Sequence, residues 1–266
     1  MGHISRIVAL ETHRVGRSAH ADDLLDFPVL DAAESGRAQR VADSLSTLHP
    51  AVVFVILMLA GLAIIALLSI GLGFLVTRVL EQGSIGAADE RVNGWLAVHR
   101  TAVRTDASLI GSIIAGGVVL PIVAGVTALT AAVFRRWRLA AFAVFSLAVE
   151  SGTYRATTLV VHSHRPTVPR LENLPVNASY PSGHTAAAIA VYGGLALLLT
   201  SRFTSGVFRT FAWTLVVAVV TFVATARMYR GMHHPFDTAG GIFVGVAALI
   251  VVVFACRAAG AAADRR

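Results

Sequence analysis

Residues 51–77, AVVFVILMLAGLAIIALLSIGLGFLVT, contain no charged side chain and decide the class of fold. At 1.5 Å per residue, a helix of this length is long enough to cross the roughly 30 Å hydrocarbon core of a bilayer. The stretch is too long, and starts too late, for the apolar region of a signal peptide, so we expect a retained span. Its apolar residues do not alternate with polar ones, which argues against a strand of a membrane β-barrel.

Further apolar stretches follow, and with the first they predict an all-α fold, a bundle of six transmembrane helices. The chain is 56% hydrophobic and only 14% charged, as expected of such a bundle. An amphipathic stretch at 92–103 precedes the second span and is typical of a segment at the membrane interface. The other expected spans cover residues 107–134, 139–161, 184–199, 207–225 and 238–255.

The chain divides into a polar N-terminal segment, one membrane domain and a short basic end. Residues 1–50 mix arginines with acids, and we expect a mostly disordered cytoplasmic tail. Residues 51–257 form the six-span domain, because no repeat or linker divides them. Residues 258–266 are the expected basic C-terminal tail. The lone Cys256 lies at the end of an apolar run and excludes an intramolecular disulfide.

All 22 basic residues are arginines, and they are dispersed along the chain. They form no block with interleaved aromatic residues, so we expect no nucleic-acid partner, whereas anionic lipid head groups suit the charge. Six spans place both termini on one side of the membrane. Most arginines lie in the segments on that side, so the positive-inside rule predicts cytoplasmic termini and outward-facing loops after the third and fifth spans.

Polar and ionisable residues gather in three clusters at the expected outer ends of spans three to six, where the folded bundle can bring them together. The clusters are His164-Arg165-Pro166, the segment 180–185 (YPSGHT) and the segment 226–237 (ARMYRGMHHPFD).

The second cluster has the features of an anion-binding helix start. The unpaired N–H groups of a first helical turn attract negative charge, Ser182 can add a hydroxyl donor, and Gly183 allows close approach. His184 stands beside them. An ordinary serine N-cap followed by an interfacial histidine would give the same tetrapeptide.

The third cluster places His233 and Asp237 four residues apart, so the carboxylate can orient the imidazole and leave its other nitrogen free to attack. An interfacial histidine with a capping aspartate is the alternative. Arg165 and Arg227 carry planar guanidinium groups that match phosphate oxygens, although a single arginine at a span end usually anchors the helix. Together on one membrane face, these groups make a complete phosphoryl-transfer site.

This combination resembles the type 2 phosphatidic acid phosphatase family, the membrane relatives of bacterial acid phosphatases and vanadium haloperoxidases. Arg165-Pro166 matches the end of the family's first motif, and residues 181–184 match its Pro-Ser-Gly-His. The segment from Arg227 through His233 to Asp237 matches the spacing of the third motif. The resemblance covers residues 150–245 in detail. We expect an integral protein of a bacterial plasma membrane, and the arginine distribution predicts that its active site faces outward.

The resemblance implies a role for each matching residue. His233 would attack phosphorus, Asp237 would orient it, and His184 would protonate the leaving oxygen. Phosphate would be held by four further residues, namely Arg165, Ser182, Gly183 and Arg227. No cofactor and no metal are implied.

Two positions depart from the family pattern. Thr158 stands where the first motif has a lysine, and Ala226 stands where a serine often precedes the third motif's arginine. Arg155 lies one turn before Thr158, and at about 100° per residue both share a helix face with Arg165, so we expect Arg155 to supply the missing charge and Thr158 a hydroxyl. A structural ion pair between Arg155 and an acid such as Glu150 is the alternative.

The resulting hypothesis is a membrane phosphatase that hydrolyses a lipid phosphate or an isoprenyl diphosphate, such as undecaprenyl diphosphate, through a phosphohistidine. A phosphotransferase using the same histidine and an inactive scaffold are the alternatives. The pair His162 and His164, with His234 nearby, could also suggest a metal site, although one His-x-His pair without neighbouring carboxylates is weak support.

Overall fold

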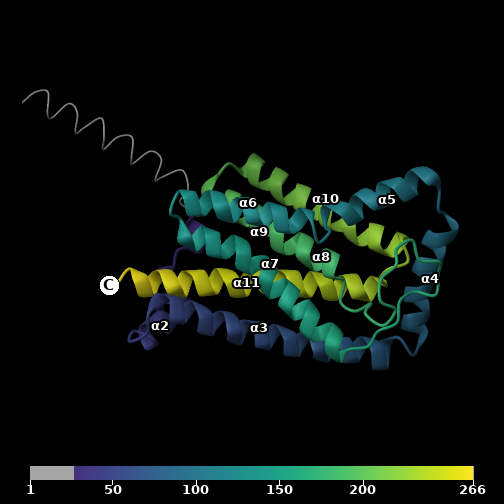
Figure 1. The fold of residues 1–266 in the computed structure, drawn as a ribbon, viewed down its shortest axis with the longest axis horizontal. Coiled ribbons are helices and arrows are strands. Elements are labelled where there is room, and N and C mark those ends of the chain that lie inside the picture. The colour runs from purple at the N-terminus through teal and green to yellow at the C-terminus, as the bar shows by residue number, and fades with distance from the viewer. Residues whose placement is uncertain (1–26, 266) are drawn as a thin grey trace, which may run out of the picture.

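The computed structural model describes residues 27–265, and its regular structure is helical (Figure 1). No β-strand occurs in this range, where one isolated bridge pairs Ser163 with Ala178. The predicted all-α fold is confirmed. In chain order the elements are η1 (Pro28–Leu30), α2 (Arg37–Ser44), α3 (Pro50–Leu75), η2 (Val76–Leu80), α4 (Ser84–Val98), α5 (Ala102–Ile114), α6 (Val119–Val133), α7 (Trp137–Val160), α8 (Gly183–Ala188), η3 (Ile189–Gly193), α9 (Gly194–Arg202), α10 (Gly206–Tyr229) and α11 (Pro235–Ala263).

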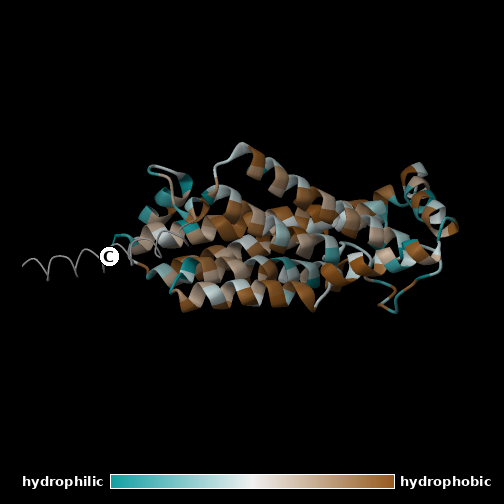
Figure 2. Ribbon diagram, turned by 90° about the horizontal axis from the view of Figure 1, so that it is seen from above, coloured by the Kyte–Doolittle hydropathy of each residue, from teal (hydrophilic) through white to brown (hydrophobic). Residues whose placement is uncertain are grey.

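Within residues 27–265, five helical units are long and apolar enough to cross a membrane. They are Pro50–Leu80, Ala102–Val133, Gly183–Arg202, Gly206–Tyr229 and Pro235–Ala263. The remaining expected span, α7, has 24 residues and packs against α3, α6 and α11, but Glu150 and Arg155 lower its apolar character. Figure 2 shows apolar residues along the bundle and hydrophilic residues at its two ends. The chain is an integral membrane protein.

Helix α11 lies at the centre of the bundle and packs against α3, α7 and α8. Two of its glycines allow α8 to touch its backbone. A Cβ on Gly241 would lie 2.4 Å from the carbonyl oxygen of Ser182, and a Cβ on Gly245 would lie 2.6 Å from that of Ala186. Small residues therefore set the start of α8 directly on α11, which brings the second and third polar clusters together.

The second expected span is interrupted. Helix α5 ends at Ile114 and α6 begins at Val119, with Gly116 and Gly117 between them. Each glycine costs about 1 kcal/mol in a helix relative to alanine, so a pair favours a break. Helix α4 lies across the end of the bundle (Figure 1), as expected of an interfacial segment, although it begins eight residues before the predicted position 92.

The two expected tails differ from the prediction where the structure describes them. Residues 1–26 lie outside the described range, but η1 and α2 within the expected N-terminal tail pack against α11. Ala38 and Ala42 are buried against Ala258 and Ala261, because α11 continues through most of the expected C-terminal tail. These alanines allow the same close approach of helices at the end of the bundle opposite α4 (Figure 1).

Candidate active site

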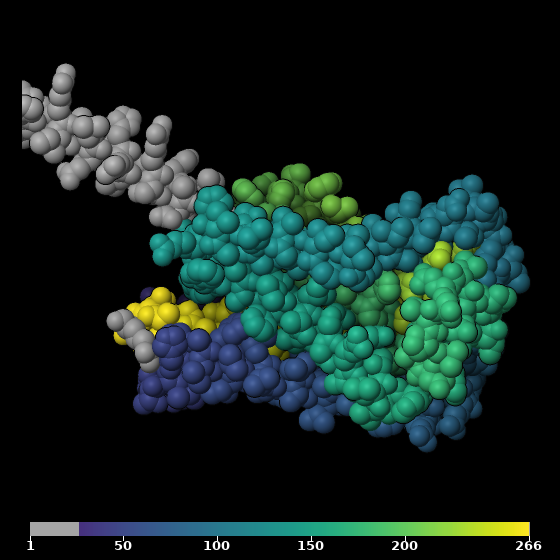
Figure 3. Space-filling model, viewed as in Figure 1, coloured from purple at the N-terminus to yellow at the C-terminus, as the bar shows by residue number. Residues whose placement is uncertain are grey.

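The three polar clusters meet around one cavity of about 270 Å³ at the end of the bundle that carries α4. The loop between α7 and α8, residues 161–182, covers this end (Figure 3). Charged and polar side chains from five parts of the chain reach the cavity wall. The lining residues are Ala115, Gly116, Gly117, Leu120, Pro121, Leu147, Glu150, Ser151, Tyr154, Arg165, Leu174, Gly183, His184, Ala187, Arg227 and His233.

His233 lies in the turn between α10 and α11 and is 3% exposed. Its Nδ1 lies 2.7 Å from the main-chain carbonyl oxygen of Ser179. A carbonyl only accepts hydrogen bonds, so Nδ1 carries the proton and Nε2 keeps its lone pair. We expected Asp237 to accept this hydrogen bond directly. Its nearest carboxylate oxygen lies 3.8 Å from Nδ1, and the Ser179 carbonyl takes its place.

Asp237 is fully buried in the first turn of α11. Its Oδ2 accepts hydrogen bonds from the main-chain N–H of His234, at 2.7 Å, and from the hydroxyl of Ser179, at 2.6 Å. Its charge also suits a helix N-terminus. Ser179 therefore connects the two residues: its hydroxyl donates to Asp237, and its carbonyl accepts from His233.

The electrostatic surroundings of His233 favour the neutral imidazole. Burial, followed by the positive charges of Arg227 and Arg165, holds the pKa of His233 well below its usual 6.5. At neutral pH, Nε2 is accordingly unprotonated. A neutral imidazole with a fixed tautomer is the form that a histidine nucleophile requires.

Two of the three residues expected at the start of α8 line the cavity, and one does not. Gly183 and His184 reach its wall. Ser182 is fully buried, and its hydroxyl lies 3.0 Å from the hydroxyl of Thr185 in the next helical turn. Its expected contribution of a hydroxyl to phosphate is not supported by this geometry, because the hydroxyl contacts Thr185 and the residue does not line the cavity.

Arg165 lines the cavity and also fixes the main chain around it. Its guanidinium donates to the carbonyl oxygens of Pro175, at 2.8 Å, and Ala178, at 3.0 Å, and to that of Met232. These bonds tie the loop after α7 to the turn that carries His233. Because a guanidinium has five N–H donors, some remain for a bound anion.

Arg227 is fully buried and reaches the same cavity from α10. Its Nη1 donates to both carboxylate oxygens of Glu172, at 2.7 and 2.8 Å, and to the Ser112 hydroxyl, at 2.8 Å. Its Nε and Nη2 have no protein partner in the part of the chain that the structure describes. Unpaired buried donors are costly, so this edge of the guanidinium is suited to an anion in the cavity.

Arg155 and Thr158 lie away from the cavity, which corrects their expected role in phosphate binding. Arg155 is exposed, and the Thr158 hydroxyl donates to the carbonyl oxygen of Arg155 at 3.1 Å. The face of α7 that lines the cavity carries Glu150, Ser151 and Tyr154 instead. The expected face included Arg165, but α7 ends at Val160, so helical periodicity does not extend to that residue.

The histidines of the alternative metal site have different surroundings. His162 and His164 are exposed, whereas His234 is 9% exposed, with Nε2 2.9 Å from Glu90 of α4. Within residues 27–265, no three His, Cys, Asp or Glu side chains gather in an arrangement that could hold a metal ion. The His-x-His interpretation therefore gains no support from the geometry.

Three residues that shape the site were not among those expected from the sequence. Ser179 links Asp237 to His233, Glu172 pairs with Arg227, and Asn93 of α4 donates to the carbonyl oxygens of Met228 and His233. Glu172 could have been noticed, because it is the only acidic residue between positions 161 and 182. Ser179 and Asn93 act through positions that only the folded chain brings together.

Comparisons with known proteins point to a family of membrane phosphatases. The family model of the PAP2 superfamily matches residues 139–259. A crystal structure of a transmembrane PAP2-type phosphatidylglycerolphosphate phosphatase from Bacillus subtilis is similar, with a TM-score of 0.58 and 19% sequence identity. The match covers 72% of this chain and 93% of that one. No curated protein sequence matches. The family-model match and the structural similarity support assignment of the chain to the type 2 phosphatase family.

Proposed function

We propose that this protein is a membrane phosphatase that hydrolyses a lipid phosphate through a phosphohistidine on Nε2 of His233. One observation carries the proposal: the Ser179 carbonyl fixes the proton on Nδ1, so the opposite nitrogen keeps its lone pair in a cavity that two guanidinium groups line. This arrangement combines a nucleophile with donors for the charge of the phosphoryl group.

The reaction proceeds in two displacements at phosphorus. In the first, Nε2 of His233 forms a bond to phosphorus as the bond to the lipid oxygen breaks, and His184 donates a proton to that oxygen. The Nε and Nη2 donors of Arg227, with Arg165, stabilise the equatorial oxygens. In the second, the oxygen of a water molecule forms a bond to phosphorus as the bond from phosphorus to Nε2 breaks, and His184 accepts a proton from the water. Phosphate is released and His233 is restored.

The surroundings of the cavity support a lipid phosphate as the proposed substrate class. The cavity opens within an apolar bundle, and its wall combines Leu147 and Leu120 with the polar groups, so one phosphorylated end and one apolar chain suit it. A phosphatidate-like lipid and an isoprenyl diphosphate both have this form. The distribution of arginines supports cytoplasmic termini, with this site on the outer face of a bacterial plasma membrane.

Trapping the covalent intermediate tests this function. Purified protein in detergent is mixed with lipid phosphate labelled on phosphorus and quenched in alkali, in which phosphohistidine is stable. We expect label on the wild type and on the exposed control His162→Ala, but none on His233→Ala. Label retained by His233→Ala, or absent from an active wild type, would contradict the mechanism.

The same assay separates hydrolysis from phosphotransfer and tests for a metal. With glycerol added as an acceptor, a hydrolase yields free phosphate, whereas a phosphotransferase yields phosphorylated acceptor in excess of it. We expect free phosphate, inhibition by vanadate and undiminished activity in EDTA, because guanidinium donors can hold the trigonal-bipyramidal oxyanion. Activity that EDTA abolishes and zinc or magnesium restores would favour a metal-assisted reaction.

A further inference from the structure

Glu172 in the loop after α7 connects that loop to two helices beside the cavity. Its carboxylate accepts from Nη1 of Arg227 at 2.7 and 2.8 Å, and from Nε of Arg230 at 2.5 Å. The Ser112 hydroxyl of α5 donates to the same carboxylate at 2.9 Å. One side chain thus joins the loop, α5 and the end of α10.

The carboxylate is charged across the working pH range. Burial alone would raise the pKa of Glu172, but the hydrogen bonds and charges of Arg227 and Arg230 lower it to about 2. A buried or half-buried charge pair of this kind gives geometry more than net stability.

Glu172 pairs with two arginines, which differ in how many of their nitrogen donors already have a partner. Arg230 also donates through Nη1 to Ser108 at 3.1 Å and through Nη2 to the Leu171 carbonyl at 3.3 Å, so all its nitrogens are engaged. Arg227 uses only Nη1, and its Nε and Nη2 have no partner within the described residues although the side chain is fully buried. Arg230 has a structural role, whereas Arg227 offers an open edge.

We propose that Glu172 is a positioning residue that turns the Nε–Nη2 edge of Arg227 toward the phosphoryl group. This inference rests on the proposed phosphatase function. Glu172 occupies the opposite edge, so substrate phosphate does not have to displace it. Two parallel N–H donors held in this way suit a pair of equatorial phosphoryl oxygens.

Substitution of Glu172 should therefore reduce the stabilisation that Arg227 gives to the transition state. Glu172→Gln keeps the size of the side chain and removes its charge. We expect a loss in kcat/KM of about tenfold to a hundredfold, mostly in kcat, and an equally large rise in the vanadate concentration needed for inhibition. Asp106→Asn is the matched control, because it removes the same charge from an exposed position on α5, and it should change neither value.

A double-mutant cycle separates positioning from a general structural role. In an Arg227→Ala background, Glu172→Gln should cost less than about threefold, because the group it orients is gone, whereas in a His184→Ala background its full cost should persist. An equal loss in both backgrounds, or an unchanged kcat/KM in the single variant, would overturn the inference. Thermal unfolding in detergent checks that each variant is folded. If the glutamine variant is unstable, Glu172→Ala takes its place in the comparison.

Failure of the phosphatase function has a different signature. If the wild type hydrolyses no lipid phosphate, the proposed function fails, and vanadate-induced thermal stabilisation then decides the inference. The inference stands if stabilisation by vanadate requires both Arg227 and Glu172, with less-than-additive losses. It is overturned if vanadate stabilises Glu172→Gln as strongly as the wild type, or stabilises neither.

Discussion

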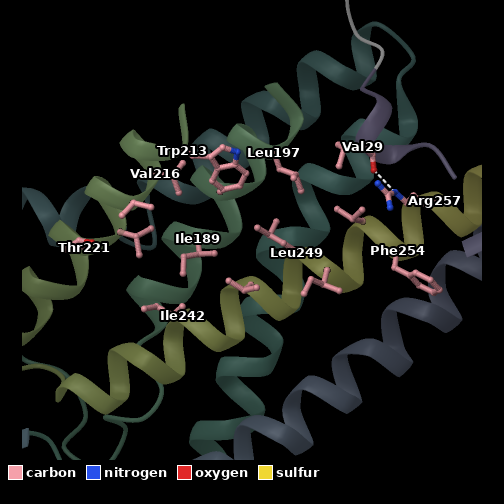
Figure 4. Close-up of a pocket in the computed structure, with 16 residues that line it drawn as sticks. Val29, Ile189, Leu197, Trp213, Val216, Thr221, Ile242, Leu249, Phe254 and Arg257 are labelled. Carbon is pink, nitrogen blue, oxygen red and sulfur yellow. Dashed lines mark hydrogen bonds between the residues drawn. The ribbon is translucent and has the colours of Figure 1, made fainter. Parts of the chain in front are cut away.

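Two of the hollows in the bundle have opposite character. The cavity at the α4 end measures about 270 Å³ and is lined by two arginines, two histidines and a glutamate among its apolar residues. A larger groove of about 780 Å³ runs between α9, α10 and α11 and is almost entirely apolar (Figure 4). Its one charged residue, Arg257, donates through Nε to the Val29 carbonyl at 2.8 Å. Volume therefore does not identify the reactive site, whereas the convergence of polar groups does.

The two hollows differ in whether their walls carry hydrogen-bond donors that need a partner. In the groove, Trp213, Leu197 and Val246 present apolar surface that lipid chains can cover without cost. In the cavity, Arg227 has buried donors that only a polar ligand can pair. Chemistry and its pH dependence are consequently expected at one end of the bundle, and substitutions that compare the two hollows test this division.

The largest effect should come from His233. We expect His233→Ala to lower kcat by at least about a thousandfold while the protein still folds, because the covalent route is lost but the helix packing is intact. Initial rates on a lipid phosphate in detergent micelles measure this. Retention of more than a tenth of the wild-type rate would remove His233 from the nucleophile's role.

A smaller and substrate-dependent effect is expected from His184. His184→Ala should lower kcat by about a hundredfold on a lipid phosphate, whose alkoxide needs a proton, and by less than about tenfold on p-nitrophenyl phosphate, whose leaving group does not. The ratio of the two losses is the measurement. Equal losses on both substrates would show that His184 is not the general acid.

The polar end should also make stability depend on pH. Burial opposes protonation of His234, but Asp237 and Glu90 raise its pKa to about 9 from 6.5. A group whose pKa is higher in the folded state stabilises the protein fully below its unfolded value and loses that contribution as pH rises toward the folded value. We expect the unfolding free energy to fall by on the order of 2 kcal/mol between pH 6.5 and 9.

Thermal unfolding in detergent across this pH range measures the change. His234→Gln should flatten the curve, because glutamine keeps a polar side chain that does not titrate. An equally steep curve in this variant would assign the pH dependence to other groups.

Arg155 should matter little, because it is exposed and lies outside the cavity. We expect Arg155→Ala to change kcat/KM by less than about twofold, within the range of an exposed surface charge. Steady-state kinetics of Arg155→Ala and Arg227→Ala, measured together, compare the two losses in kcat/KM. A loss of tenfold or more would show that α7 turns toward the substrate during the reaction.

Arg155 also shows how far the sequence predicts this site. Arg227, His233 and Asp237 lie at the end of one helix, in a tight turn and at the start of the next helix, so their spacing nearly determines their geometry. The α7 end is different: once the helix stops at Val160, the position of Arg165 depends on three carbonyl contacts that no periodicity encodes.

The same reasoning explains the other differences. Apolar length predicted the helical bundle because the bilayer imposes it. The contacts of Ser179 and Glu172 were not predicted, because a loop residue acquires its partners only from tertiary packing. The packing of α2 on α11 was missed because alanine-rich helix contacts leave a weak signal in hydropathy.

The smallest effect should come from filling the groove. Val246 lines the groove and is 45% exposed, so a larger ring there displaces lipid rather than protein. We expect Val246→Trp to change kcat/KM by less than about twofold, as for a substitution outside the reactive site. Leu147→Trp, which adds comparable volume to the wall of the cavity, should abolish most activity by excluding substrate. If the Val246 variant instead raises KM for long-chain lipids but not for a short-chain phosphate, the groove belongs to the path of the substrate chain, and the two hollows act as one site.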